Sequence, residues 1–320
     1  MMYDWGMFTL RQLKSFVAAY EEGSFTRAAR RENATQSGVS QHVSSMEERL
    51  GAPLFERNAA GVGPTTAGRL LYPRAVEALR GLDLGVEEVR AALGGLSGTV
   101  RAGLMPSFTR AALSPALECF LAAHPHVRTQ VIEGYSGALS DMVRAGALDF
   151  ALVPAGSGTA GLRVSPLARD REMLLTAARG SPADAVPHLA SVRLSDLGPL
   201  RIVVPGTANV RRTQLETYFE AQGVRIERLL EMDTMLGTLE LVARSDWVTV
   251  LPGVICAGDL DGRQRRINPL AAPELISEFV IIEPARTALT PAAARFLSVL
   301  RQEIERLVAL IPATSLPADV

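Results

Sequence analysis

A helix face made of amide and hydroxyl side chains is the feature of this chain with the clearest chemical use. Between residues 39 and 50, apolar residues recur at steps of four, three and four, which predicts one buried stripe of a helix. They are Val39, Val43, Met46 and Leu50. The opposite face carries Gln36, Ser37, Ser40, Gln41 and Ser44. Because amides and hydroxyls both donate and accept hydrogen bonds, this face is typical of a helix that reads base edges in the DNA major groove.

Shorter helical elements are expected to hold this face in place. A first helix spans residues 10–22 and ends at Gly23, since glycine adopts the left-handed conformation without strain. Ser24 caps the second helix, and Thr35 caps the third. A plain helical bundle with a solvated face is the alternative. Such a face normally carries Glu, Lys and Arg, whereas no charged residue occurs from Thr35 to Met46.

Four segments of the chain carry a pattern shared with one known family. Three are N-terminal: LRQLKSFVAAYEEGSFTRAA (10–29), TQSGVSQHVSSMEERLGAPLFER (35–57) and PTTAG (64–68). The fourth is EGYSGALSDMVRAGALDFAL (133–152). Together they resemble the LysR-type transcriptional regulators, and the fourth resembles the effector domain of that family. The resemblance implies an N-terminal winged helix-turn-helix, a long linker helix and a two-subdomain α/β effector domain like a periplasmic binding protein.

The resemblance also implies roles for individual residues in DNA binding. By position, the base-contacting residues are Gln36, Ser37, Ser40 and Gln41, and the phosphate-contacting residues are Arg27, Thr35, Arg57 and Thr65. His42 lies among the recognition residues and is a further candidate for the phosphate backbone. Gly38 stands where the family usually has Ala, and Gln41 replaces an Arg that many members carry. The wing, residues 58–63, lacks the basic residues often found there.

The long helix expected after Thr65 carries a second apolar stripe. Its members recur at steps of three, four, three and four, which is the heptad pattern of a helix pair. They are Leu79, Leu82, Val86, Val89 and Leu93. Packing on its own DNA-binding domain is the alternative. The resemblance favours pairing with a second copy, which gives a homodimer or a homotetramer built from two dimers.

Beyond this helix, strands alternate with helices, which predicts an α/β fold with a parallel sheet. The expected elements include one helix over 110–123 and a strand over 173–177. The expected fold class is therefore an α+β multidomain protein. We assign residues 1–65 to the DNA-binding domain, 66–94 to the linker helix and 95–98 to a hinge. Effector subdomain I then comprises 99–167 and 270–311, subdomain II comprises 168–269, and 312–320 form a tail.

Polar residues that follow the predicted strands are the candidates for an effector site. In folds of this kind, ligands bind outside the carboxyl ends of the strands, where helices begin and backbone N–H groups favour anions. The candidates are Ser107, Thr109, Ser136, Thr207, Asn209 and Thr234. Each could instead simply cap its helix. Arg211 or Arg212 could hold a carboxylate, with surface exposure expected for at least one of them, so we expect an organic acid or aromatic carboxylate as effector.

Composition limits the remaining functional classes. Residues 24–74 hold seven Arg and four Glu, a local charge of +3 in a chain of net charge −1, so we expect few phosphate contacts. The two cysteines, Cys119 and Cys256, suit a reducing cytoplasm. His124 and His126 lack neighbouring ligands, so we expect no metal. No secretory signal, membrane span or nucleophile–base set is evident, and we expect a cytoplasmic protein without cofactor, catalytic residues or enzymatic activity.

The leading interpretation is a ligand-responsive transcription factor that binds promoter DNA. Its expected partners are double-stranded promoter DNA, RNA polymerase, a small-molecule effector and further copies of the chain. The alternative is a cytoplasmic solute-binding or catalytic α/β protein with an incidental helical N-terminus. Turnover of a ligand would favour that alternative.

Overall fold

The computed structural model describes residues 8–58, 61–92, 95–156, 158–207 and 209–311. Leu93 and the side chain of Arg57, both singled out above, lie outside the described parts. The chain divides into two compact units. One comprises Met1–Gly94 with Arg286–Thr290, and the other comprises Gly95–Ala285 with Pro291–Val320. No helix in the described ranges has the length and apolar character needed to cross a membrane.

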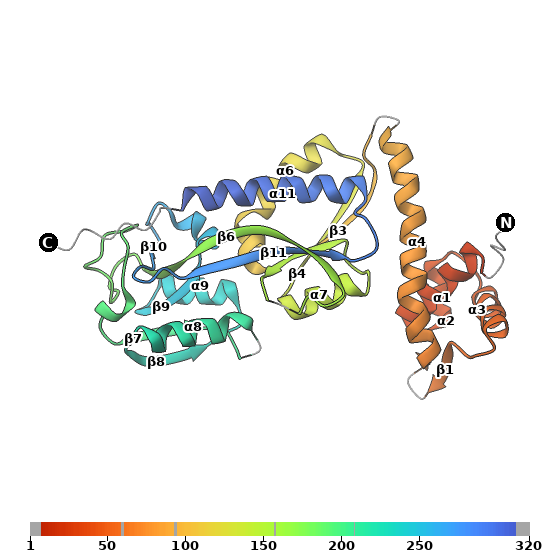
Figure 1. The fold of residues 1–320 in the computed structure, drawn as a ribbon, viewed down its shortest axis with the longest axis horizontal. Helices are drawn as coiled ribbons and strands as arrows, with labels where there is room; N and C mark the ends of the chain where they lie inside the picture. The colour runs from red at the N-terminus through yellow and green to blue at the C-terminus, as the bar shows by residue number, and fades with distance from the viewer. Residues whose placement is uncertain (1–7, 59–60, 93–94, 157, 208, 312–320) are drawn as a thin grey trace. The chain divides into compact units, whose positions relative to one another are not determined.

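The first unit is a three-helix domain with a β-hairpin and a long following helix (Figure 1). Its elements are α1 (Leu10–Glu22), α2 (Phe25–Arg31), α3 (Gln36–Leu50), β1 (Phe55–Asn58), β2 (Gly61–Pro64) and α4 (Thr66–Ala92). Strands β1 and β2 pair antiparallel and form the wing. The predicted winged helix-turn-helix and linker helix are therefore present.

Local capping explains why these helices begin and end where they do. The side chains of Ser24 and Thr35 accept hydrogen bonds from the first turns of α2 and α3. Gly23 and Gly51 end α1 and α3 in the left-handed conformation, with φ of +56° and +66°. Thr9 adds a capping box with Gln12 at the start of α1.

The predicted stripe of α3 is buried except at its end. Val39, Val43 and Met46 are buried, whereas Leu50 is 39% exposed. The prediction for Leu50 was wrong because α3 stops at the next residue. The chain then turns back, and Leu54 fills the core beneath the helix.

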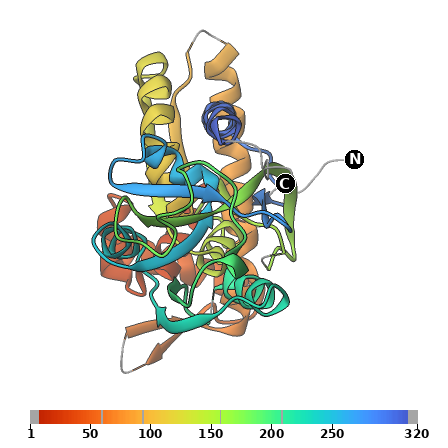
Figure 2. The same cartoon turned by 90° about the vertical axis from the view of Figure 1, so that its left-hand side faces the viewer.

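The second unit is built on one mixed sheet whose strand order is β4-β3-β5-β11-β6-β9-β7-β8, with β10 paired to β6. We call the region around β3, β4 and β5 the first lobe and the region around β7, β8, β9 and β10 the second lobe. The first lobe contains β3 (Gly98–Leu104), α5 (Pro106–Ala111), α6 (Leu113–Ala123), β4 (Val127–Glu133), α7 (Ser136–Arg144), β5 (Phe150–Pro154) and α11 (Pro291–Leu310). Helix α11, seen end-on in Figure 2, packs against α6 and β3.

The second lobe repeats the alternation of strands and helices. It contains η1 (Leu194–Asp196), β7 (Leu200–Val204), α8 (Val210–Ala221), β8 (Ile226–Glu231), α9 (Met235–Ala243), β9 (Trp247–Pro252), α10 (Gly253–Cys256), η2 (Ala257–Asp259) and β10 (Arg265–Pro269). Strands pair in parallel within each lobe, as predicted. Every pairing of β6, β10 and β11 is antiparallel, which the expectation of a parallel sheet missed.

Strands β6 (Leu162–Ala177) and β11 (Ile276–Pro284) run between the two lobes (Figure 1). Strand β6 pairs with β11 up to Arg171 and with β9 from Glu172 onward, so it passes from one lobe to the other at that point. The sequence predicted only its apolar end, 173–177. Its first half is charged, and its arginines form ion pairs with glutamates of β11 or of the segment before it: Arg163–Glu283, Arg169–Glu278 and Arg171–Glu274.

Two smaller boundaries also differ from the prediction. Two helices occupy the region in which one helix over 110–123 was expected. Helix α5 begins earlier, with Pro106 at its first position, and ends at Ala111, and α6 follows it. Gly98, assigned to the hinge, is the first residue of β3.

Candidate DNA-binding and effector-binding sites

Helix α3 presents the predicted polar face to solvent. Gln36, Ser37, Gln41 and Ser44 are exposed, and Ser40 is half-buried. The opposite side of α3 packs into the core of the domain. The side chains needed for hydrogen bonds to base edges are therefore available on one rigid helix.

Two hydrogen bonds fix α3 against α1. The Ser15 hydroxyl lies 2.8 Å from Nδ1 of His42, and Gln12 Nε2 donates to Ser45 Oγ at 3.1 Å. His42, a predicted phosphate contact, is half-buried and engaged with α1. This geometry gives His42 a part in orienting the recognition helix.

The N-terminus of α3 explains Gly38. The Thr35 hydroxyl accepts from the backbone N–H of Gly38 at 3.1 Å. A Cβ on residue 38 would lie 3.1 Å from that same hydroxyl oxygen, which is a tight contact. Glycine costs about 1 kcal/mol of helix propensity relative to alanine. At this position it leaves room for the cap.

The predicted phosphate contacts differ in how free their side chains are. Arg27 is mostly exposed, with an ion pair to Glu22 at 3.5 Å. The Thr65 hydroxyl donates to the carbonyl of Pro53 at 2.6 Å and accepts from the N–H of Gly68 at 3.1 Å. Its proton is thus committed to the Pro53 carbonyl while its oxygen caps α4, and a phosphate contact donated by this hydroxyl would need the bond to Pro53 to break.

The candidate effector residues lie where strands of both lobes end. Ser107 and Thr109 follow β3 and Ser136 follows β4, all in the first lobe, whereas Thr207 and Asn209 follow β7 and Thr234 follows β8. A hydrogen bond from the Tyr135 hydroxyl to the backbone carbonyl of Asp233, 2.7 Å long, joins the ends of β4 and β8. The strand ends of the two lobes therefore face each other, and the neighbours of this bonded pair are Ser136 and Thr234.

Tyr135 and Asp233 were not singled out from the sequence. The Asp233 carboxylate accepts from the N–H of Gly206 at 3.0 Å, and a Cβ on residue 206 would lie 2.3 Å from that carboxylate. Glycine at this position is what permits the contact. Burial, followed by the carboxylates of Asp233 and Glu133, raises the pKa of the Tyr135 hydroxyl. The sequence signal that could have identified this pair is the position of an aromatic residue and an acidic residue shortly after two strands.

Several candidates are engaged in capping, the alternative considered above. Asn209 accepts from the N–H of Arg211 at 3.1 Å, and Thr234 accepts from the N–H of Gly237 at 3.4 Å. Thr109 donates to the carbonyl of Pro106 and contacts the carboxylate of Glu133. Thr207 is exposed and Ser107 is buried.

Both arginines of α8 are buried, so the expectation that at least one is solvated was wrong. Arg211 is 7% exposed and donates to Glu172 at 2.6 Å and to the carbonyl of Val250 at 3.2 Å. Arg212 is 8% exposed and pairs with Glu216 at 2.7 Å and Glu231 at 3.3 Å. The Arg211 guanidinium, expected to hold an effector carboxylate, is already neutralised by Glu172.

The stripe of α4 is divided between two environments. Leu79 is half-buried and packs on the core of its own domain. Leu82, Val86 and Val89 are exposed and line an apolar hollow of about 370 Å³ together with Gly81 and Gly85. Among the described residues of the stripe, Leu79 alone packs on the DNA-binding domain, which was the alternative to pairing.

The described residues contain no group of three or more His, Cys, Asp or Glu placed to hold a metal. Cys119 is exposed, and Cys256 is buried with its thiol donating to the carbonyl of Pro252 at 3.3 Å. Burial raises the pKa of the Cys256 thiol well above its ordinary value.

Comparison with known families matches both units. A family model described as "Bacterial regulatory helix-turn-helix protein, lysR family" matches residues 10–69, and one described as "LysR substrate binding domain" matches residues 93–305. The nitrogen assimilation regulatory protein nac of Klebsiella aerogenes is 27% identical over 301 residues, which cover 93% of this chain and 95% of that protein. A probable hydrogen peroxide-inducible genes activator of Mycobacterium leprae is 30% identical over 245 residues, covering 76% and 78%.

Solved structures share the fold over nearly the whole chain. A full-length OxyR variant from Pseudomonas aeruginosa has a TM-score of 0.74 at 21% identity, covering 97% of this chain and 99% of that one. Full-length CbnR in complex with its target DNA has a TM-score of 0.58 at 20% identity, covering 92% and 100%.

Proposed function

This chain belongs to the LysR family of DNA-binding transcriptional regulators with an effector-binding domain, and from that premise we propose how its own residues perform the two tasks. Helix α3 reads promoter DNA through Gln36, Ser37, Ser40 and Gln41, and Arg27, Thr35 and Arg57 contact phosphates. A small effector binds between the lobes of the second unit. The observation that carries the DNA-reading proposal is the exposed, uncharged face of a capped and well-packed α3.

The experiment is fluorescence anisotropy of the full chain on DNA from upstream of its own gene, with random DNA of equal length as control and salt varied. We expect salt-sensitive binding with a preference of about a thousandfold or more for the upstream DNA. Equal affinity for both DNAs, with and without candidate effectors, would count against a regulator that acts at this promoter.

Replacing Gln36 by alanine is expected to relax sequence specificity. A good bidentate contact between an amide side chain and a base contributes about 1–3 kcal/mol of discrimination. Affinity for the upstream DNA should fall by that amount, whereas affinity for random DNA should hardly change. Gln302→Ala, an exposed glutamine in α11, is the matched control. Equal losses on both DNAs would remove Gln36 from base readout.

We propose that the effector is a small organic acid that also carries a hydrogen-bond donor. Backbone N–H groups at the strand ends favour its anionic group, while the carboxylates of Glu133 and Asp233 favour a hydroxyl or amino group. Arg211, near the start of α8, is held by Glu172. Aliphatic and aromatic acids both meet these requirements.

Replacing Thr207 by alanine is expected to weaken the effector response while leaving DNA affinity intact. Thr207 is exposed at the end of β7, where its hydroxyl can reach a ligand between the lobes. A panel of small hydroxy and amino acids is screened by thermal shift, and the best binder is titrated into both proteins. Thr213→Ala, an exposed threonine on α8, controls for loss of a hydroxyl. Identical titration curves would exclude Thr207 from the site.

We further propose that α4 pairs with α4 of a second copy through Leu82, Val86 and Val89. These residues form an exposed apolar stripe at heptad spacing beside two glycines that permit close approach. The pairing would place two α3 helices on successive half-sites. A dimer or a tetramer built from dimers, and contact with RNA polymerase, complete the proposed assembly.

Peroxide sensing, which the names of some relatives suggest for those proteins, is not supported by the environment of Cys256. The reactive form of cysteine is the thiolate. Cys256 is fully buried, and burial holds the pKa of its thiol high, so the thiolate is disfavoured.

Members of this family are generally not enzymes, and we extend that to this chain.

A further inference from the structure

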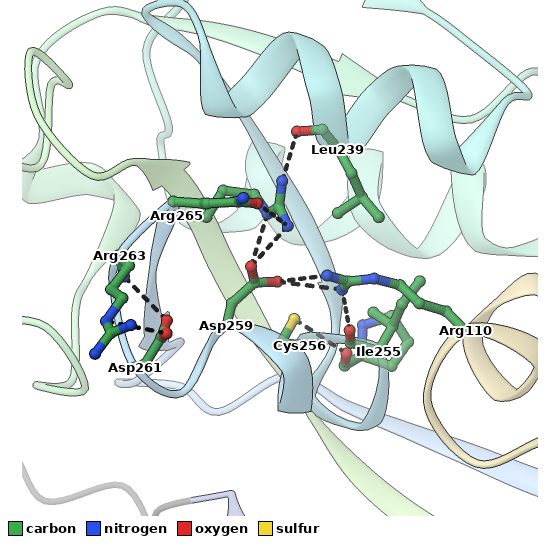
Figure 3. Close-up of polar contacts among 10 residues, drawn as sticks. Arg110, Leu239, Ile255, Cys256, Asp259, Asp261, Arg263 and Arg265 are labelled. Carbon is green, nitrogen blue, oxygen red and sulfur yellow. Dashed lines mark hydrogen bonds and ion pairs between the residues drawn. The ribbon is translucent and has the colours of Figure 1, made fainter. Parts of the chain in front are cut away.

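Figure 3 shows a polar network at the junction of the lobes, which joins α5 of the first lobe to α9 of the second. Both terminal nitrogens of Arg110, on α5, donate to Oδ2 of Asp259 at 3.1 Å, and Arg110 also bonds to the carbonyl of Ile255. The other carboxylate oxygen of Asp259 accepts from Arg265 Nε at 2.8 Å. Arg265 in turn donates to the carbonyl of Leu239, on α9, at 3.2 Å.

Each end of this network carries candidate effector residues. Helix α5 holds Ser107 and Thr109 directly before Arg110, and α9 begins after its cap, Thr234. We propose that Arg110 is a positioning residue that couples the two lobes and so sets how they respond to effector, an inference that rests on the proposed effector site. We call Arg110, Asp259 and Arg265 the interlobe clamp. An effector that moves α5 relative to α9 has to distort or break the contacts of the interlobe clamp.

Arg110 is the residue of the interlobe clamp whose contacts can break most easily. Its side chain is 26% exposed, whereas that of Asp259 is 2% exposed. When the Arg110 guanidinium moves away from Asp259, the Asp259 carboxylate keeps its ion pair with the buried Arg265. The buried carboxylate is therefore not left unpaired, which limits the cost of the movement. A hollow of about 230 Å³ gives the guanidinium room to move. It is lined by Arg110, Ala111, Ile255, Ala257, Gly258 and Leu307.

Release of the clamp changes the arrangement of the lobes without separating them. Strands β6 and β11 still connect them, and the Tyr135 hydroxyl still reaches the carbonyl of Asp233. We therefore expect two arrangements of the second unit, one with the Arg110–Asp259 ion pair formed and one with it broken. A ligand that binds one arrangement better shifts the population toward it.

Double electron–electron resonance on the full chain tests the coupling without effector or DNA. Spin labels are placed on cysteines that replace two exposed acids, Asp141 on α7 and Glu220 on α8, in a Cys119→Ser background. Cys256 is buried and stays unlabelled. Labelled protein is diluted with unlabelled protein, so that only distances within one chain are recorded. Thermal unfolding of each variant is followed in parallel.

Wild type and the control Arg306→Met, an exposed arginine of α11 paired with Glu303, should share one narrow distance distribution. Arg110→Met and Arg110→Gln should each displace or broaden it at nearly unchanged unfolding temperature. Arg110→Lys should largely restore it, because an ammonium still pairs with Asp259. The inference is overturned if both neutral variants keep the wild-type distribution, or if the Arg110→Lys distribution is displaced as far as those of the neutral variants. The distance measurement uses no effector, so a negative result would not affect the prediction for Thr207. Likewise, an unchanged effector response of Thr207→Ala would not affect the coupling through Arg110.

Discussion

Replacing Glu172 by alanine is expected to lower the free energy of unfolding of the second unit by about 3–5 kcal/mol, the cost of removing one partner of a buried ion pair. Glu172 is 1% exposed. Its carboxylate accepts from Arg211 at 2.6 Å and from the Ser277 hydroxyl at 2.5 Å. Alanine would leave the buried Arg211 guanidinium with the Val250 carbonyl as its one partner among the described residues.

The backbone of Glu172 lies where the chain crosses between the lobes. Its N–H donates to the carbonyl of Leu275 at 2.8 Å, and its carbonyl accepts from the N–H of Leu270 at 3.1 Å. Both crossing segments therefore meet at this residue. Loss of the ion pair is expected to weaken the packing of β6 against β9 and of α8 against both.

Urea unfolding followed by tryptophan fluorescence measures the effect. The chain has two tryptophans, and a Trp5→Phe background leaves Trp247, at the start of β9, as the reporter of the second unit. Glu303→Ala, which breaks an ion pair with Arg306, a side chain that is 57% exposed, is the control and should cost about 0–1 kcal/mol. Replacing Glu172 and Arg211 together by methionine should recover much of the loss. Equal costs for Glu172→Ala and Glu303→Ala would refute the assignment.

Replacing Asp170 by asparagine is expected to remove a large pH dependence of stability. Burial, opposed by the N–H of Val254 and reinforced by the carboxylate of Glu172, raises the pKa of Asp170 from 3.8 to about 7. One carboxylate oxygen accepts from Val254 at 2.7 Å, and the other has no hydrogen-bond partner among the described residues. A Cβ on Gly253 would lie 2.8 Å from that second oxygen.

The sign of the dependence follows from the raised pKa. The folded chain holds this proton more tightly than the unfolded chain, so the stabilisation is complete below the ordinary pKa and is lost as pH rises through about 7. A rise of this size corresponds to about 4 kcal/mol between the two limits. Most of the loss should fall between about pH 4 and pH 7.

Urea unfolding of wild type and Asp170→Asn, with Trp247 again the reporter, is compared across that pH range. The asparagine carbonyl can still accept from Val254, and no charge develops at any pH. The difference in unfolding free energy between the two proteins should therefore shift in favour of the variant as pH rises. Asp261→Asn, an exposed acid after η2, is the control and should follow wild type. A constant difference across the range would show that Asp170 titrates as an ordinary carboxylate.

The amino-acid sequence by itself determined the helices of the first unit and the polar face of α3. Caps such as Ser24 and Thr35 act on the next turn of the same helix, and the stop at Gly23 depends on one residue's backbone. These interactions are local, so residue types and spacing are sufficient to predict them. The same holds for the alternation of strands and helices in the second unit, whose apolar strands are distinct from their polar connections.

Tertiary structure alone decided the contacts of the effector-binding unit. Arg110 and Asp259 are 149 residues apart in sequence, and Arg211 and Glu172 are 39 apart. No local pattern specifies which distant carboxylate an arginine meets, and so Arg211 was expected to face a ligand. The charged half of β6 was missed for the same reason, since its arginines suit a strand only when glutamates lie opposite them across the sheet.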